Sequence, residues 1–279
     1  VIAEIGRWNT YGDVTLLGRV LSAAFDLGTI VMLFLIGRRL FDWRVAALAA
    51  FLVAVTPLHI QQSHFFTMDT FLVFFLTTAF YYAVRVAQEG GLRHYALLGL
   101  FYGLATASKI NAATFGLVVL AACALRAWQN GAAREQPSAA GDGGAEGAAR
   151  PGGLARLWRQ GEEPLSGFCL ALAVAFVVFR LGQPYAFTGP GPFDLGLSPK
   201  YLADLDQWRK ISTGEVDYPP SIQWANRPAY LYPLQQLVLW GMGPPLGLAS
   251  WAGVALAALY WLRALRTRPA RARDLLLAL

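Results

Sequence analysis

The stretch Pro57–Phe75, PLHIQQSHFFTMDTFLVFF, places side chains that can do chemistry between two apolar runs. His59, His64 and Asp69 carry imidazole and carboxylate groups, which are common ligands of divalent metals. Asp69 directly precedes TFLVFF, where an unpaired carboxylate in a membrane span is costly. It is a candidate metal ligand or catalytic carboxylate, or alternatively a helix N-cap that favours the positive end of the helix dipole. The alternative for the histidines is simple contact with lipid headgroups.

Two basic residues, Lys109 and Arg180, also interrupt or end apolar runs. Lys109, in SKIN, interrupts the apolar run Tyr95–Trp128, and a helix break at membrane depth is tolerated where it is buried in protein or lines a wet cavity. Lys109 is a candidate phosphate ligand, with Asn111 beside it as a further donor, or else a lysine that snorkels to the surface. Arg180 closes a later apolar run, and we expect a phosphate or carboxylate partner for it.

Arg19 and Asp26 lie seven residues apart in the first apolar run. This spacing puts them on one face of a helix, and we expect them to pair with each other in a structural role.

The composition indicates a membrane protein. Of 279 residues, 56% are hydrophobic and only 14% are charged, whereas soluble domains average about 25% charged residues. The net charge of +6 is explained by Lys and Arg in cytoplasmic loops, and no basic, aromatic-rich soluble segment predicts nucleic-acid binding. Cys123 and Cys169, the two cysteines, both lie inside apolar runs, which argues against a disulfide framework or a zinc site.

We predict an all-α membrane protein, a polytopic helical bundle with about seven spans and an outward-facing loop region. The predicted spans are about 16–36, 45–59, 70–86, two short helices within 95–128 that meet near Lys109, 166–179 and 247–262. Alternating them puts every arginine cluster on one face, which is the cytoplasm by the positive-inside rule. The opposite, outer face then carries Asp69, the histidines and the break at Lys109.

The spans divide the chain into three parts. Residues 1–127 form an N-terminal region with five spans, and 128–165 is a Gly- and Ala-rich segment that we predict to be a disordered cytoplasmic linker. Residues 166–279 contain two further spans around an external loop, 183–245. The aromatic residues of this loop suit either sugar stacking or an interfacial belt. Because the chain starts with Val and ends in mid-pattern, we expect a fragment that lacks residues at both ends.

Residues 16–127 resemble the integral-membrane glycosyltransferases of the GT-C superfamily. The resemblance rests on GRVLSAAFDLGTIVMLFLIGRRLFDWRVAALAAFLVAVTPLHIQQSHFFTMDTFLVFF followed by GLFYGLATASKINAA. It is closest to the bacterial relatives of the dolichyl-phosphate-mannose protein mannosyltransferases and of the lipid A aminoarabinose transferase. The later WANRPAYLYPLQQLVLWGMGPPLGLASWAG is also similar to members of this group. The order of these features carries the resemblance, rather than any single motif.

The resemblance implies an enzyme that takes a sugar from a polyprenyl-phosphate donor at the outer leaflet. The sugar passes, with inversion, to a hydroxyl of a protein, lipid or glycan acceptor. Asp69 matches an acidic residue that helps hold a divalent metal near the phosphate. Lys109 matches the basic residue near the carrier phosphate, and His64 lies in the same motif as Asp69. With Arg180, these residues are the predicted phosphate environment.

The resemblance places the catalytic base in a first external loop that should lie before residue 1. Glu4 and Asp13 do not have the context of that loop, so the base is unknown and the fragment alone is expected not to turn over. The predicted protein is a multi-pass glycosyltransferase of the plasma or inner membrane, working in the cell envelope among membrane lipids. An alternative is a transporter or flippase of a lipid-linked or anionic solute, although the sequence shows no repeated halves. A non-catalytic scaffold is disfavoured by the intramembrane charges.

Overall fold

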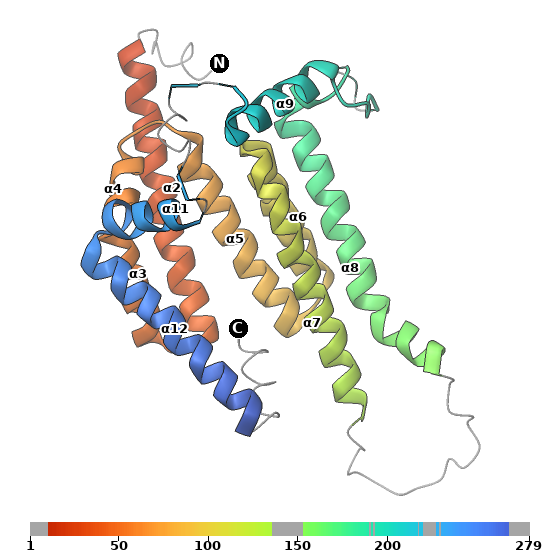
Figure 1. The fold of residues 1–279 in the computed structure, drawn as a ribbon. Coiled ribbons are helices and arrows are strands. Elements are labelled where there is room, and N and C mark those ends of the chain that lie inside the picture. Colours follow the sequence, from red (N-terminus) through yellow and green to blue (C-terminus); the bar gives the residue numbers. More distant parts are fainter. Residues whose placement is uncertain are drawn as a thin grey trace, which may run out of the picture.

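The computed structural model describes residues 11–135, 153–189, 191, 193–216, 218–219, 227–228 and 230–267. Within these ranges every regular element is a helix, and the single β-bridge is isolated, which confirms the predicted all-α fold (Figure 1). The α-helices are α2 (Tyr11–Leu40), α3 (Trp43–Ala54), α4 (Pro57–Ser63), α5 (Met68–Glu89), α6 (Leu92–Ser108), α7 (Gly116–Glu135), α8 (Gly153–Gly182), α9 (Pro199–Thr213), α11 (Leu231–Gln236) and α12 (Pro244–Thr267). Three short helical turns are η1 (Ile110–Phe115), η2 (Pro184–Ala186) and η3 (Leu237–Gly241).

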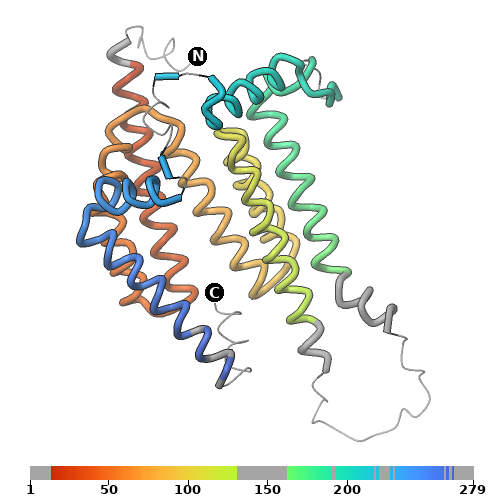
Figure 2. Tube along the Cα trace, viewed as in Figure 1, coloured from red at the N-terminus to blue at the C-terminus, as the bar shows by residue number. Residues whose placement is uncertain are grey.

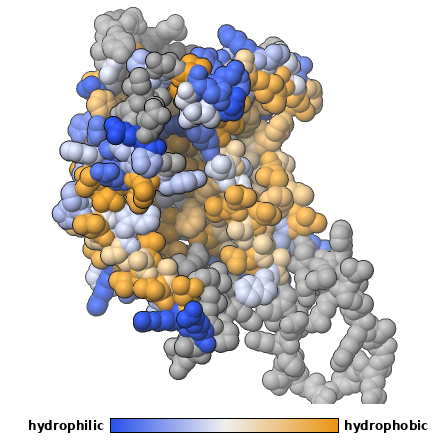
Figure 3. Space-filling view, viewed as in Figure 1, coloured by the Kyte–Doolittle hydropathy of each residue, from blue (hydrophilic) through white to orange (hydrophobic). Residues whose placement is uncertain are grey.

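Four helical segments of the described residues are long and apolar enough to cross a membrane. They are Val14–Leu40, Met68–Glu89, Ile110–Asn130 and Glu162–Gly182. Helices α3 and α4, bent by 61° at their junction, make a fifth if they form one span. Each predicted span falls on helical structure, although the span 45–59 covers the bent pair α3 and α4. Because α6 and the apolar part of α12 are also short, the number seven stays a prediction. On the face shown in Figure 3, hydrophobic side chains gather over the middle of the helices.

Small residues let α6 and α8 approach closely. Gly99 and Gly103 of α6 face Ala171 and Ala175 of α8, and a Cβ atom at Gly99 would lie only 2.3 Å from the carbonyl oxygen of Ala171. Close packing through small residues four apart is a common way for membrane helices to associate. This contact belongs to a buried core that contains Leu98 of α6 and Ala171 of α8, together with residues of α5 and α7.

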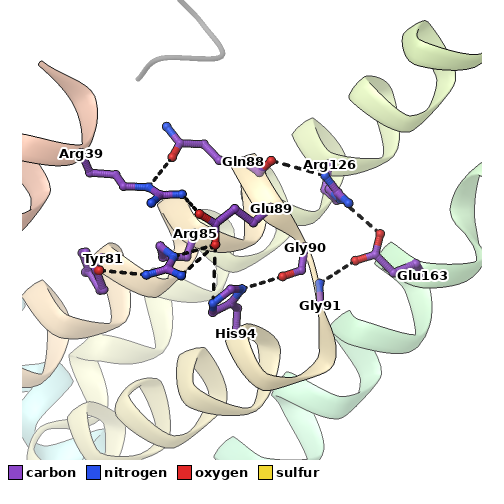
Figure 4. A network of polar contacts seen from close by, with 10 residues as sticks. All are labelled: Arg39, Tyr81, Arg85, Gln88, Glu89, Gly90, Gly91, His94, Arg126 and Glu163. Carbon is purple, nitrogen blue, oxygen red and sulfur yellow. Dashed lines mark hydrogen bonds and ion pairs between the residues drawn. The ribbon is translucent and has the colours of Figure 1, made fainter.

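Ion pairs tie the ends of five helices together at the predicted cytoplasmic face (Figure 4). Glu89 at the end of α5 pairs with Arg39 at the end of α2. Glu163 of α8 accepts hydrogen bonds from Nε of Arg126 in α7 at 3.1 Å and from the backbone N–H of Gly91, which precedes α6, at 2.9 Å. Because this cluster contains several of the arginines that predicted the topology, it links the charge pattern to the packing of the helix ends.

The described helices reach into the predicted linker and the predicted loop. Helix α7 runs to Glu135 and α8 begins at Gly153, so both enter the range 128–165, while residues 136–152 lie outside the described residues. Within 183–245, α9 lies at the opposite end of the bundle from the connected ends of α7 and α8 (Figure 2). On its exposed surface, hydrogen bonds from Lys210 and Arg209 lower the pKa of Asp206.

Candidate functional site

Helices α2, α4 and α5 enclose a cavity of about 230 Å³. Its wall combines two carboxylates, an imidazole, an amide and a hydroxyl with two apolar side chains. The lining residues are Asp26, Leu58, His59, Gln62, Asp69, Thr70 and Val73. Such a concentration of polar groups among apolar helices is expensive, and intramembrane ionisable residues usually mark a functional site.

Pro57 explains how α4 comes to face this cavity. A proline disfavours helical backbone at the residue before it, and Thr56 is accordingly extended, with φ −70° and ψ 119°. Helix α3 therefore ends at Ala54, and α4 starts at Pro57 in a direction 61° away. The bend turns His59 and Gln62, which are three residues apart and share a helix face, towards α2 and α5.

Asp69 and Lys109 meet at the edge of this site. Nζ of Lys109 donates a hydrogen bond to Oδ1 of Asp69 at 2.9 Å. Lys109 lies between α6 and η1 with an extended backbone, so the predicted helix break is confirmed. The two side chains are 40% and 42% exposed, and an ion pair in contact with solvent contributes at most about 1 kcal/mol to stability. A contribution to folding stability is therefore a weak explanation for the presence of this ion pair.

The N-cap interpretation of Asp69 is wrong. Helix α5 begins at Met68 with Thr67 as its N-cap, and the Asp69 carboxylate contacts Lys109 rather than a backbone N–H at the helix start. Asp69 still lies in the first turn, where the helix dipole favours a negative charge.

Asp26 pairs with His59 rather than with Arg19. Oδ1 of Asp26 lies 2.7 Å from Nδ1 of His59, and the two side chains are 14% and 26% exposed. The predicted pairing of Arg19 with Asp26 fails because residues two helical turns apart are separated by about 10 Å along the axis. The bend before α4 instead brings His59 directly to Asp26.

His64 ends α4 outside the cavity wall. It is the C-cap residue of that helix, it is exposed, and its Nδ1 lies 2.6 Å from the carbonyl oxygen of Ile60. It remains in the segment that leads into Asp69, and its role in phosphate binding stays a prediction.

Arg180, near the end of α8, binds the chain segment that follows that helix. Its Nη2 donates hydrogen bonds to the carbonyl oxygens of Gly189 at 2.8 Å and Gly191 at 2.6 Å, and its guanidinium lies over the ring of Phe187. Its hydrogen-bond partners among the described residues are thus backbone carbonyls rather than the expected anion, and its Nε is buried without a partner there. A role of Arg180 in donor binding stays a prediction.

The predicted metal ligand is Asp69. Among the residues that the structure describes, no group of three or more His, Cys, Asp or Glu side chains is arranged to hold a metal ion. Mg²⁺, however, is often bound by only one or two carboxylates together with substrate phosphates and water. A single carboxylate whose Oδ1 faces Lys109 fits that kind of shared site, with Oδ2 available to the ion.

Asp26, Gln62 and Thr70 belong to the cavity but were not predicted as site residues, and His59 was considered only as a possible metal ligand or headgroup contact. Asp26 carried a usable signal, because a carboxylate in the middle of an apolar run needs a partner. The partner itself depends on the direction of α4 after Pro57, which spacing along the chain does not give.

Residues 10–136 match a family model described as dolichyl-phosphate-mannose-protein mannosyltransferase. The matched range runs from the start of α2 to the end of α7 and contains both ion pairs of the site, whereas Arg180 lies beyond it. The match confirms the predicted resemblance to GT-C membrane glycosyltransferases. At the level of this family, the sugar donor is linked to a polyprenyl phosphate. Searches of curated proteins and of solved structures each found no match.

Proposed function

We propose that the protein transfers a sugar from a polyprenyl-phosphate donor to an acceptor hydroxyl at the outer face of the membrane, with inversion. The observation that carries the proposal is the Asp69–Lys109 pair, which stands at a helix break beside a polar cavity inside the family-matched region. The acceptor is a protein, lipid or glycan hydroxyl. The membrane is the plasma or inner membrane of the cell.

Phosphate is the leaving group of this reaction, so its growing negative charge must be stabilised. Lys109 supplies a fixed positive charge next to the cavity, and Asp69 holds that lysine in place. A divalent metal bound at the Asp69 carboxylate would polarise the phosphate and add positive charge where it develops. Charges placed in advance where negative charge develops stabilise the transition state, and they act most strongly once bound substrate displaces water from the site.

His64 and Arg180 are the other two residues of the proposed phosphate environment, and neither of them lines the cavity. His64 sits at the end of α4, on the chain segment that leads into Asp69. Arg180 lies near the end of α8, is buried, and is bound to loop carbonyls. Their contributions to donor affinity are expected to be smaller than that of Lys109.

A transfer assay on the full-length protein tests the proposal. Membranes containing it receive a polyprenyl-phosphate donor labelled in the sugar, with Mg²⁺ or Mn²⁺ or with a chelator. A transferase releases the carrier phosphate and places the label on an acceptor, and we expect the chelator to lower this rate. Labelled lipid that crosses the bilayer with its sugar–phosphate bond intact would contradict the proposal and favour the transporter, which the broken helix at Lys109 also suits.

A further inference from the structure

We propose that the connection between α2 and α3 binds one anionic phospholipid, whose headgroup phosphate is held by Arg38 and Arg44. The two arginines lie on either side of a connection of only two residues, Phe41 and Asp42. Gly37, near the end of α2, packs so closely on α3 that a Cβ atom there would lie 2.7 Å from the backbone of that helix. Arg38, the connecting residues and Arg44 thus form one corner of the bundle, the α2–α3 corner.

Neither arginine of this corner is neutralised by a carboxylate. Both are exposed, and among the residues that the structure describes neither guanidinium forms an ion pair or a hydrogen bond. Arg39, which follows Arg38, differs because it pairs with Glu89. Asp42 is the one acidic residue of the corner, and its Oδ1 already accepts hydrogen bonds from two backbone N–H groups of α3, each at 2.9 Å. Two guanidinium groups against one carboxylate leave the corner positively charged.

An aromatic ring lies beside each of the two guanidinium groups. Cζ of Arg38 is 5.9 Å from the ring centroid of Phe34, and Cζ of Arg44 is 5.7 Å from that of Trp43. Both distances are within the range of cation–π contact. Such a contact uses the face of the guanidinium and leaves the N–H groups at its edge free, which suits paired hydrogen bonds to phosphate oxygens.

The exposed aromatic side chains of the corner favour a lipid over a free phosphate ion. Phe41 is 58% exposed and Trp43 is 64% exposed, and aromatic rings of this kind are typical of the membrane–water interface. The corner lies at the same end of the bundle as the ion pairs of Figure 4, which include Arg39. At this predicted cytoplasmic face, anionic phospholipids attract basic residues. An anionic phospholipid supplies both a phosphate for the arginines and acyl chains for the rings.

Binding of phosphatidylglycerol to the purified full-length protein in a neutral detergent tests the proposal. Native mass spectrometry counts the bound lipids, and a titration measures their affinity, with phosphatidylcholine or inorganic phosphate as competitor. Arg38→Gln, Arg44→Gln and the double variant remove the charges of the corner. Arg93→Gln is the matched control, because Arg93 is also exposed at this end of the bundle, at the start of α6, without an ion pair or ring contact among the described residues.

We expect the wild type to retain one phosphatidylglycerol that neither phosphatidylcholine nor inorganic phosphate displaces. Each single variant of the corner should bind this lipid about fivefold more weakly, the usual contribution of one basic residue at an anionic lipid surface, and the double variant about 25-fold more weakly. Arg93→Gln should bind it like the wild type. Because the substituted side chains are exposed, all variants should keep a melting temperature close to that of the wild type without lipid.

Equal losses of affinity in Arg93→Gln and in the corner variants would overturn the inference, because they would show a diffuse attraction to the positive end of the molecule. Displacement by inorganic phosphate would also overturn it and leave a simple anion site, and displacement by phosphatidylcholine would leave an unspecific lipid contact. Unchanged binding in the double variant would place the lipid elsewhere. None of these measurements involves sugar transfer, so their outcome is separate from that of the transfer assay.

Discussion

Arg180 combines a buried charge with hydrogen bonds to two loop carbonyls, and its contacts predict a measurable cost of removal. Arg180→Ala takes the donor away from the carbonyls of Gly189 and Gly191. Hydrogen bonds to charged groups contribute about 1.5–3 kcal/mol each, so the loss of both should make the variant less stable by about 3–6 kcal/mol. Thermal unfolding of the purified protein and proteolysis of the segment between α8 and α9 measure this effect.

Arg180→Lys separates this structural role from donor binding. Lysine keeps the charge but lacks the planar fork that can serve two acceptors. If the contacts to the loop dominate, both variants lose stability. A lysine variant with normal donor affinity and an alanine variant with reduced affinity, at equal stability, would instead show that the charge serves the donor.

Glu163, at the predicted cytoplasmic end of the bundle, accepts the hydrogen bonds that hold α8 to α7 and to the turn before α6. Its carboxylate accepts from Arg126, from Asn130 and from the backbone of Gly91. Because the carboxylate is 35% exposed, we expect Glu163→Gln to cost about 1–2 kcal/mol, the lower end for a charged hydrogen-bond network. Thermal unfolding measures it, with the neighbouring Glu162→Gln as control. Equal melting temperatures for the two variants would contradict the prediction.

At the scale of elements, the close approach of α6 to α8 holds the break at Lys109 in place. Gly99→Leu inserts a side chain where even a Cβ atom meets the backbone of Ala171 at 2.3 Å. Overpacking of this kind costs about 1–3 kcal/mol or more, and the helices must separate. Gly253→Leu in α12 is the control, because a Cβ atom there meets nothing within 4 Å.

The melting temperature and the transfer rate of these two glycine variants are the measurements. We expect both to fall for Gly99→Leu and neither to change for Gly253→Leu. A stable Gly99→Leu protein with normal transfer would mean that α6 can shift without moving Lys109.

For the whole molecule, the charge pattern predicts which end faces the cytoplasm. In a background with Cys123→Ala and Cys169→Ala, single cysteines replace Ser212 in α9 and Arg93 at the start of α6. A membrane-impermeant maleimide should label Ser212→Cys in intact cells and Arg93→Cys only after permeabilisation. The reverse pattern would invert the topology and move the cavity to the cytoplasmic half.

The apolar runs and the charges that interrupt them were sufficient to predict the helices and the break at Lys109, because long apolar runs have few alternatives to helix in a membrane. The sequence placed Asp69 and Lys109 in one predicted phosphate site, but it did not predict that their side chains contact each other. The partner of Asp26 was mispredicted, since it depends on the bend at Pro57 and on three-dimensional packing. The four-residue spacing of the small residues Gly99 and Gly103 is a sequence signal for close helix packing, but it does not say which helix packs against them.

The central claim is that the Asp69–Lys109 pair serves sugar transfer rather than folding. The most direct measurement compares Asp69→Asn and Lys109→Ala with Asp206→Asn and Lys210→Ala, in the transfer assay and in thermal unfolding. The control pair lies in α9 and matches the site pair in length, at 2.7 Å against 2.9 Å, and in exposure, at 46% and 43% against 42% and 40%.

All four variants should insert into the membrane and unfold within about 1 kcal/mol of the wild type, as expected for solvent-exposed ion pairs. We predict that transfer is abolished by Asp69→Asn, falls at least about 100-fold in Lys109→Ala, and is unchanged in the α9 variants. Near-normal transfer by Asp69→Asn in a stable, inserted protein would contradict the claim and leave the pair as a surface contact between α5 and the end of α6.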